Sequence, residues 1–201
     1  MHIGIFGGTF DPPHLGHSAV VSECLRQKLF DAVWYLPAVV HDPQFSKPWM
    51  SSSKHRLAML ELVVAEHQAR GEAVRVETLE IDEKMPGLTH ATLRELAQRH
   101  PEHSFSFIIG SDQLAKLHLW GCDIETACFP GIFAEFDWYV YPRGGAPIIQ
   151  LPFAELKTIA GVEPVEIGST DIRERVKKYL SLENFVTQVV AEYVLGHKLY
   201  Q

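Results

Sequence analysis

Short apolar segments with the pattern of strands alternate along this chain with segments whose apolar residues recur at helical spacing. The segment 1–6 is apolar or alternating, as expected for a buried strand, and after Gly16 the apolar residues Val20, Val21 and Cys24 follow a helical period. The other strands that the pattern predicts are 32–37, 73–79, 104–109, 137–141 and 162–167. The other predicted helices are 54–70, 89–100, 113–119, 171–180 and 183–195, with a long loop at 39–53.

Strands that alternate with helices indicate an α/β fold with a mainly parallel sheet. We predict a Rossmann-like, doubly wound sheet with helices on both faces. In such sheets ligands bind beyond the carboxyl ends of the strands, near the point where the strand order reverses. Polar and glycine-rich segments follow three of the predicted strands, at 7–17, 110–112 and 143–145. Their common placement predicts a single site.

The composition is that of an ordinary globular protein. A length of 201 residues is enough for one domain with a sizeable core, and we predict a single domain over 1–201 with the C-terminal helices from about residue 169 packed on it. The hydrophobic content is 46% and the charged content 21%. No apolar run approaches the length of a membrane span, so no membrane partner is expected.

Charge and cysteine content narrow the function further. The net charge of −7 weighs against a nucleic-acid partner, because general nucleic-acid binders present a basic face. Any anion site must therefore be built from local positive groups. The three cysteines form no CxxC pair and no signal peptide is evident, so a cytoplasmic location is expected. The formation of homo-oligomers stays open.

The segment after the first strand predicts a tight loop and the first turn of a helix. Gly7 and Gly8 allow a close backbone approach that a side chain would prevent. His14 and His17 then stand at the start of a helix, where unpaired backbone donors and the positive end of the helix dipole meet. This arrangement favours a polyphosphate ligand.

Two other interpretations of His14 and His17 are weighed against phosphate binding. One is a plain strand-to-helix turn with two surface histidines. The other is a zinc pair, since the residues are three apart, although no Cys or carboxylate cluster completes a ligand set. The specificity of the whole segment and its place at a helix start favour the phosphate.

A second candidate segment lies at 167–173, at the start of the next-to-last predicted helix. Asp171 and Glu174 are expected to form a capping pair there. Arg173 would lie in the first helical turn, where a cation opposes the helix dipole. A local rule broken in this way indicates a bound anion; the alternative is a solvated arginine.

These segments resemble a known family. The segment 7–17, Gly-Gly-Thr-Phe-Asp-Pro-Pro-His-Leu-Gly-His, resembles the HxGH signature of the nucleotidyltransferase superfamily. The segment 168–173 resembles the second signature of that superfamily, Ser-Ser-Thr-x-Ile-Arg, with Gly168 in place of the first Ser. Nearly the whole chain is similar to bacterial nicotinate-nucleotide adenylyltransferases, enzymes of NAD biosynthesis. The supporting segments between the signatures are Lys47, 55–60, 89–93, 108–114, Trp120 and 143–145.

Three positions depart from the pattern of that family. Ser46-Lys47 stands where the family has His-Lys, Gly87-Leu88-Thr89 where it has Ser-Tyr-Thr, and Arg143-Gly144-Gly145 where it has Arg-Pro-Gly. The first two lie where an acceptor nucleotide would bind. They concern the identity of the acceptor more than adenylyl transfer itself.

The resemblance implies adenylyl transfer from ATP to nicotinate mononucleotide without a covalent nucleophile. It implies that His14, His17 and Arg173 are catalytic, with His17 nearest the α-phosphate. The residues implied in ATP binding are Gly7, Gly8, Thr9, Phe10, Gly110, Asp112, Ser169 and Thr170. Mg²⁺ would bridge phosphate oxygens with ligands largely from water and ATP, so no protein metal ligand is expected.

Five residues are expected to bind the acceptor, which are Lys47, Arg56, Thr89, Trp120 and Arg143. Trp120 could stack on a pyridine ring or be a core tryptophan. Lys47 could be an ordinary surface lysine, and Arg56 could cap or pair on its own helix.

Two other functions stay open. One is a sibling nucleotidyltransferase that uses nicotinamide mononucleotide, phosphopantetheine, or CTP with a sugar phosphate. Chain length and the Trp120 segment weigh against phosphopantetheine. The other is a non-catalytic nucleotide-binding regulator, against which the intact His14, His17 and Arg173 argue.

Overall fold

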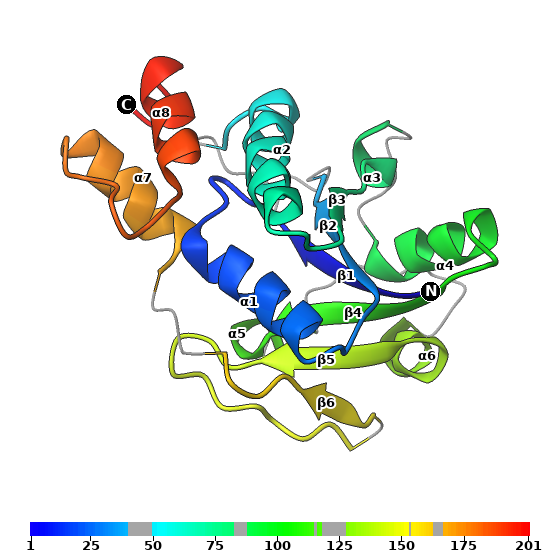
Figure 1. The fold of residues 1–201 in the computed structure, drawn as a ribbon. Coiled ribbons are helices and arrows are strands. Elements are labelled where there is room, and N and C mark those ends of the chain that lie inside the picture. The colour runs from blue at the N-terminus through cyan, green and yellow to red at the C-terminus, as the bar shows by residue number, and fades with distance from the viewer. Residues whose placement is uncertain (40–49, 83–87, 115, 118–127, 153, 163–166) are drawn as a thin grey trace.

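A six-stranded sheet forms the centre of the computed structural model, which describes all residues except 40–49, 83–87, 115, 118–127, 153 and 163–166 (Figure 1). Its strands are β1 (His2–Gly8), β2 (Ala32–Pro37), β3 (Val74–Val76), β4 (Ser104–Gly110), β5 (Asp137–Tyr141) and β6 (Leu156–Thr158). They lie in the order β3-β2-β1-β4-β5-β6, and each pair of neighbours is parallel. The predicted Rossmann-like α/β fold is confirmed.

Helices connect these strands and follow the last of them. They are α1 (Leu15–Arg26), α2 (Ser53–Ala69), α3 (Leu79–Asp82), α4 (Thr89–Arg99), α5 (Ser111–Leu114), α6 (Cys128–Glu135), α7 (Ser169–Lys177) and α8 (Gln188–Gly196). Within the described ranges, none of them combines the length and the apolar character that crossing a membrane requires.

Two apolar clusters, one on each face of the sheet, make up the core. The first contains Phe6 of β1 and Ile108 of β4 and is covered by residues of α1, α2, α7 and α8. The second contains Ile5 and Phe107 of the same strands and is covered by residues of α3, α4, α5 and α6. Because successive side chains of a strand point to opposite faces, the continuous apolar runs of β1 and β4 supply both clusters. Helices therefore cover both faces of the sheet (Figure 1).

Several elements begin or end elsewhere than predicted. β1 continues through Gly7 and Gly8, which the sequence analysis assigned to a loop. β3 ends at Val76, and the short helix α3 takes the place of the predicted strand end near Leu79. The last helix, α8, begins at Gln188, five residues after the predicted start at 183.

The sixth strand is β6, and the sequence analysis missed it. The predicted strand at 162–167 is wrong at both of its described ends, since Val162 and Ile167 lie outside the sheet, and 163–166 lie outside the described residues. β6 is a three-residue edge strand in which Lys157 and Thr158 are exposed. A short and mostly exposed strand has no apolar alternation by which a sequence could reveal it.

The strand order reverses at β1, which lies between β2 and β4. Ligands of this fold class bind at such a reversal, beyond the carboxyl ends of the strands. Because β1 and β4 are parallel, the loop after β1 and the start of α5 after β4 lie at the same edge of the sheet. The topology thus brings two of the candidate segments together.

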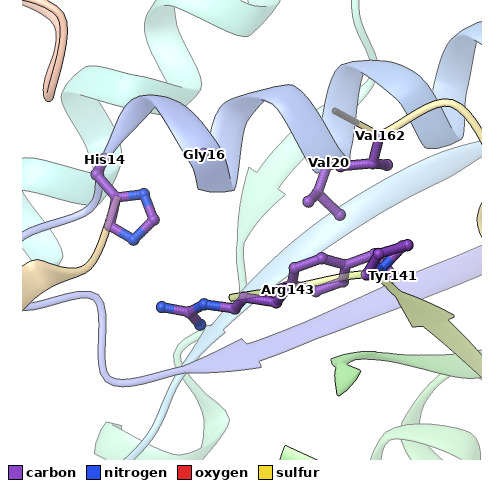
Figure 2. Close-up of a pocket in the computed structure, with 7 residues that line it drawn as sticks. His14, Gly16, Val20, Tyr141, Arg143 and Val162 are labelled. Atoms are coloured by element: carbon purple, nitrogen blue, oxygen red, sulfur yellow. The ribbon is translucent and has the colours of Figure 1, made fainter. Parts of the chain in front are cut away.

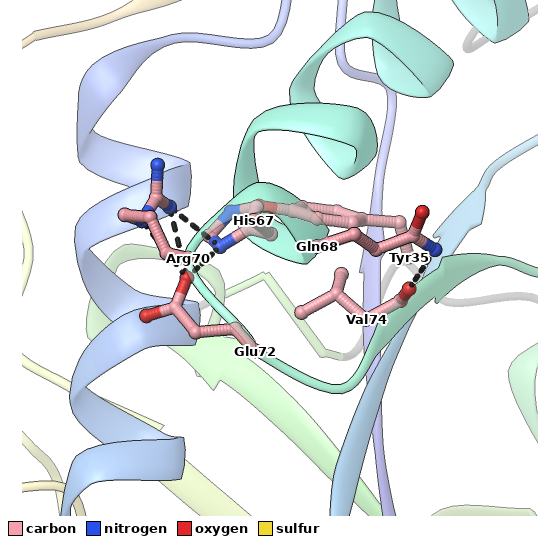
Figure 3. Close-up of polar contacts among 6 residues, drawn as sticks. All are labelled: Tyr35, His67, Gln68, Arg70, Glu72 and Val74. Atoms are coloured by element: carbon pink, nitrogen blue, oxygen red, sulfur yellow. Dashed lines mark hydrogen bonds and ion pairs between the residues drawn. The ribbon is translucent and has the colours of Figure 1, made fainter.

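A polar cluster fixes the end of α2 against β2 (Figure 3). His67 of α2 is fully buried, with Nδ1 at 2.6 Å from Oε2 of Glu72 and Nε2 at 3.3 Å from the hydroxyl of Tyr35. Nη2 of Arg70 donates to the same Glu72 oxygen at 2.9 Å. Burial lowers the pKa of His67 and outweighs the opposing effect of Glu72. The imidazole is therefore neutral in the folded protein at neutral pH.

The buried neutral His67 should make the stability of the fold depend on pH. A histidine in the unfolded chain titrates near pH 6.5, so below that pH the unfolded state takes up a proton that the folded state does not. As the pH falls from 7 to about 5.5, the free energy of unfolding should fall, with up to about 1.4 kcal/mol per pH unit from this group. Urea unfolding at both pH values measures the effect.

The variant His67→Gln should be less stable at pH 7 but should lose less of its remaining stability on acidification, because it lacks the titrating group. His197→Gln changes an exposed histidine and should keep the parent's pH dependence. The same pH dependence in His67→Gln and in the parent would contradict the assignment.

Candidate active site

Arg56 holds the loop that follows β1. Its guanidinium, which is buried, donates through Nη1 to the carbonyls of Thr9 and Ala38, each at 2.9 Å. It thereby joins the loop after β1 to the residue after β2. Both contacts leave its own helix, so the alternative that Arg56 caps or pairs on that helix is wrong. Nε of Arg56 is buried without a hydrogen-bond partner in the described part of the chain.

Phe10 gives the loop its shape. Its φ is 50°, in the left-handed region, and its side chain is buried against Phe6, Tyr35 and His17, with ring centroids 4.9 to 5.6 Å apart. Non-glycine residues rarely adopt this conformation, and packing of the ring stabilises it here. The side chain of Phe10 thus belongs to the core, and its backbone is the part that remains for ligand contacts.

Gly7 and Gly8 lack side chains because neighbouring rings occupy the space. A Cβ on Gly7 would lie 2.6 Å from the ring of Phe107, and one on Gly8 would lie 2.9 Å from the ring of Phe10. The close approach that the sequence predicts is therefore real, and its partners are two phenylalanines. The glycines let β1 end under a well-packed loop.

His14 and His17 stack on one another at the start of α1. Their ring centroids are 3.5 Å apart, and the backbone N–H of His14 donates to Nδ1 of His17 at 3.1 Å. Because Nδ1 of His17 accepts this bond, the proton of its neutral ring is on Nε2. Both ring nitrogens of His14 are buried and have no hydrogen-bond partner among the described residues. The interpretation of two surface histidines is therefore wrong.

Both imidazoles are held in the neutral form. Burial, with a smaller contribution from Arg143, lowers the pKa of His14 to about 3. Burial also lowers the pKa of His17 well below its usual value, and His14 and Arg143 add to this effect. At neutral pH the pair can offer N–H donors without carrying a charge.

Residues of α7 reach the same loop. The guanidinium of Arg173 donates to the carbonyl of Asp11 at 2.7 Å and to the hydroxyl of Thr170 at 2.9 Å. The hydroxyl of Ser169 donates to the carbonyl of Pro12 at 2.9 Å. The two segments that the sequence analysis singled out are therefore in direct contact.

The start of α7 differs from the prediction. Gly168 is the N-cap, and its backbone N–H donates to Asp171 at 3.1 Å, whereas Glu174 pairs with Lys177. The predicted capping pair of Asp171 and Glu174 is wrong. Arg173 is the fifth helical residue and lies beyond the first turn, but helical side chains lean toward the N-terminus, so its guanidinium still reaches that end. It is buried, which excludes the solvated alternative.

A pocket opens between the start of α1 and the end of β5 (Figure 2). The residues that line it are His14, Gly16, Val20, Tyr141, Pro142, Arg143 and Val162. The side chain of Arg143 points toward the ring of His14 in this pocket. The backbone N–H of Arg143 donates to the hydroxyl of Ser111 at 2.9 Å, which joins this loop to the start of α5. Arg143 thus lies beside a predicted phosphate-binding residue.

Gly110 and Asp112 lie at the carboxyl end of β4. A Cβ on Gly110 would lie 2.6 Å from Oδ1 of Asp112, so the carboxylate folds back over the glycine. Oδ1 is 4.0 Å from Nε of Arg143 and, among the described residues, has no hydrogen-bond partner. Oδ2 accepts from Gln113 at 2.7 Å. The carboxylate is therefore hydrogen-bonded through one oxygen, while the other lies at ion-pair distance from Arg143.

Of the five predicted acceptor-binding residues, the structure describes Arg56, Thr89 and Arg143. Thr89 is the first residue of α4, after the N-cap Leu88, whose side chain makes no capping bond. The hydroxyl of Thr92 in the same helix donates to Glu80 at 2.9 Å. Lys47 and Trp120 lie outside the described residues. The structure therefore brings the segments of the predicted ATP-binding residues together, whereas the acceptor set is described only in part.

The sequence analysis missed three residues that bind the loop after β1 or the residues that follow β2. Glu80 is buried and accepts from the backbone N–H of Val39 at 3.1 Å. Ser51 and Tyr200 both contact the carboxylate of Asp11. A buried glutamate in a polar stretch and a tyrosine near residue 201 carry no local signal, because each acts through a tertiary contact.

Known proteins are similar to this chain over nearly its whole length. A model of the cytidylyltransferase-like family matches residues 5–175. A relative from Exiguobacterium sibiricum, named a probable nicotinate-nucleotide adenylyltransferase, is 32% identical over 200 residues, which cover 100% of this chain and 99% of the relative. A relative of the same name from Geobacillus thermodenitrificans is 34% identical over 98% of this chain and 85% of its own length.

A solved structure supports the fold independently. Plasmodium falciparum nicotinic acid mononucleotide adenylyltransferase, complexed with NaAD, superposes with a TM-score of 0.80 at 19% identity, over 99% of this chain and 97% of that one. The likeness at this identity concerns the fold alone. On the family model and the full-length relatives, the chain belongs to the cytidylyltransferase-like family and, within it, to the nicotinate-nucleotide adenylyltransferases.

Proposed function

We propose that this chain transfers the adenylyl group of ATP to nicotinate mononucleotide and releases pyrophosphate, the activity in the names of its relatives. The observation that carries this proposal is the direct contact of the two anion-binding segments. Arg173 and Ser169 bond to the backbone of Asp11 and Pro12, which are 162 and 157 residues away in the sequence. Each segment alone favours a phosphate, and together they favour a polyphosphate.

The reaction needs positioned donors and no protein nucleophile. A phosphate oxygen of the mononucleotide attacks the α-phosphorus of ATP and forms a P–O bond, while the bond from this phosphorus to the bridging oxygen of pyrophosphate breaks. The electron pair leaves with pyrophosphate. Catalysis of this kind consists mainly of positioning and of stabilising negative charge on oxygens.

In this proposal His14 and His17 contact the phosphates of ATP, with His17 nearest the α-phosphate. Each neutral ring can donate one N–H, and a bound polyanion would raise the pKa of both rings. Arg173, Ser169 and Thr170 hold the leaving pyrophosphate. The remaining ATP contacts are assigned to Gly7, Gly8, Thr9, Phe10, Gly110 and Asp112.

The acceptor is assigned to the other side of the α-phosphate. Arg143 is the cation nearest to His14 in the pocket and is suited to the acceptor's phosphate, which must approach that point to attack. Thr89, at the start of α4, is assigned to the pyridine carboxylate, because a helix start favours an anion. The other proposed acceptor-binding residues are Lys47, Arg56 and Trp120.

We assign Mg²⁺ to the phosphates of ATP and to water. Among the described residues there is no group of three or more His, Cys, Asp or Glu side chains that could hold a metal ion. The carboxylate of Asp11, in the loop after β1, is already bound by Ser51 and Tyr200. The ion would neutralise charge on the phosphate oxygens, and the residues of this chain would position the phosphates.

The role of His17 predicts a large effect on turnover. His17→Ala should lower turnover by about a hundredfold or more, the scale of one lost donor to a developing oxyanion. The affinity for ATP should fall much less, because the donor matters most in the transition state. Steady-state kinetics and calorimetric titration with ATP measure the two effects, with His197→Ala as the control. Equal turnover in the variant and the parent would refute the role.

The role of Arg173 predicts an effect on both binding and turnover. Arg173→Ala should weaken ATP binding and slow turnover, and Arg173→Lys should restore only part of both, since a point charge replaces a planar fork. Lys177→Ala, in the same helix but paired with Glu174, is the matched control. The prediction fails if Arg173→Ala keeps both the KM for ATP and turnover of the parent.

The start of α4 predicts a preference for the acid over the amide acceptor. Charge-assisted hydrogen bonds to a carboxylate are about twice as strong as neutral ones, so nicotinate mononucleotide should be preferred by at least about tenfold in kcat/KM, or about 1.4 kcal/mol. The measurement is a competition between nicotinate and nicotinamide mononucleotides at equal concentration, with both dinucleotides quantified. Equal products, or an excess of the amide product, would show that the acceptor is wrong.

A further inference from the structure

The carboxylate of Asp11 is buried in the loop after β1 and is bound by side chains from two other parts of the chain. Only 1% of Asp11 is exposed. Oδ2 accepts from the backbone N–H of Ser51 at 3.1 Å. Oδ1 accepts from the hydroxyl of Ser51 and from the hydroxyl of Tyr200, the latter at 2.5 Å. The hydroxyls of Ser51 and Tyr200 are themselves 2.9 Å apart.

Two buried arginines surround this carboxylate. Arg173 donates to the backbone carbonyl of Asp11, and Arg56 donates to that of Thr9. Burial lowers the pKa of both arginines, and Asp11 opposes that effect in each. A buried charge is costly unless it is paired and hydrogen-bonded. The charge of Asp11 therefore favours both guanidinium groups in their buried places.

The contacts leave Asp11 little freedom to move. Its backbone is bound by Arg173 and its side chain by Ser51 and Tyr200, while His14 caps α1 three residues later. A shift of the carboxylate would carry the backbone with it and would displace His14 and Arg173 relative to one another. These are the two groups to which the phosphates are assigned.

We infer that Tyr200 is a positioning residue for ATP: its hydroxyl fixes the carboxylate of Asp11 and, through it, the loop that places His14 and Arg173. The inference rests on the proposed function. Ser51 has the same task from the other side, at the entry to α2. Residues near both ends of the chain thus build one phosphate site.

The test compares two equal changes in the C-terminal segment. Tyr200→Phe removes the hydroxyl that binds Asp11 and keeps the ring. Tyr193→Phe removes a hydroxyl that lies 3.0 Å from Nδ1 of His55 and does not contact the loop. Because a hydrogen bond to a charged group is lost, Tyr200→Phe should weaken ATP binding and lower kcat/KM for ATP, each by about fivefold or more, whereas Tyr193→Phe should change neither by more than about twofold. ATP affinity is measured by calorimetry without an acceptor.

A double-variant cycle separates positioning from simple stability. If Tyr200 acts through the carboxylate, Tyr200→Phe should add less than about a twofold loss of ATP affinity to Asp11→Ala, which removes both side-chain acceptor oxygens. Thermal unfolding of each variant shows that binding is measured on folded protein. Parent-like ATP affinity in Tyr200→Phe, or full additivity with Asp11→Ala, would overturn the inference. If the parent binds ATP but uses no acceptor, the proposed function fails while the affinity comparison still decides the role of Tyr200.

Discussion

The site depends on the backbone of the loop after β1, which buried guanidinium groups hold from two sides. Arg56 binds the carbonyl of Thr9, and Arg173 binds that of Asp11. Charge-assisted hydrogen bonds of this kind are short and strong, and they fix a carbonyl in space. The loop can therefore keep the left-handed Phe10, which few sequences would tolerate without such support. His14 caps α1 at the end of the same loop, so its place follows from these bonds.

The charges around this loop fit the polyphosphate of the proposed function. The arginines carry permanent positive charge, whereas burial keeps His14 and His17 neutral by lowering their pKa values. A second pair of buried cations would raise the cost of folding, because each would need its own counter-ion. Neutral imidazoles avoid this cost and still offer N–H donors. Arg143 adds a positive charge at the edge of the pocket, where solvent can screen it. In the proposed function the two rings would gain charge only when a phosphate is bound, because a nearby anion raises their pKa.

Much of this could be read from the sequence, and the failures have physical causes. The strands β1 and β4 are buried on both faces, so they appear in the sequence as continuous apolar runs. The helix after Gly16 is buried on one face, so its apolar residues recur at helical spacing. The sequence missed β6 because an exposed edge strand has little apolar content. It placed Arg173 two residues nearer to the helix start than it is, because the helix begins at Ser169 and Asp171 is its third residue, which bonds to the N-cap Gly168. The contacts of Asp11 with Ser51 and Tyr200 join residues 40 and 189 positions apart, which no local pattern records.

The long sequence separations also bear on when the site forms. The sheet and the helices up to α6 contain the His14 and His17 segment, but the loop receives Arg173 and Tyr200 only when α7, α8 and the residues after them are in place. Closing so long a loop costs entropy that grows only slowly with its length, so a few strong contacts are enough to offset it. Val190 and Val194 of α8 belong to the cluster that α1 and α2 also cover, which couples this docking to the main core. In the proposed function, phosphate binding therefore depends on the docked C-terminal helices as much as on the segment 7–17.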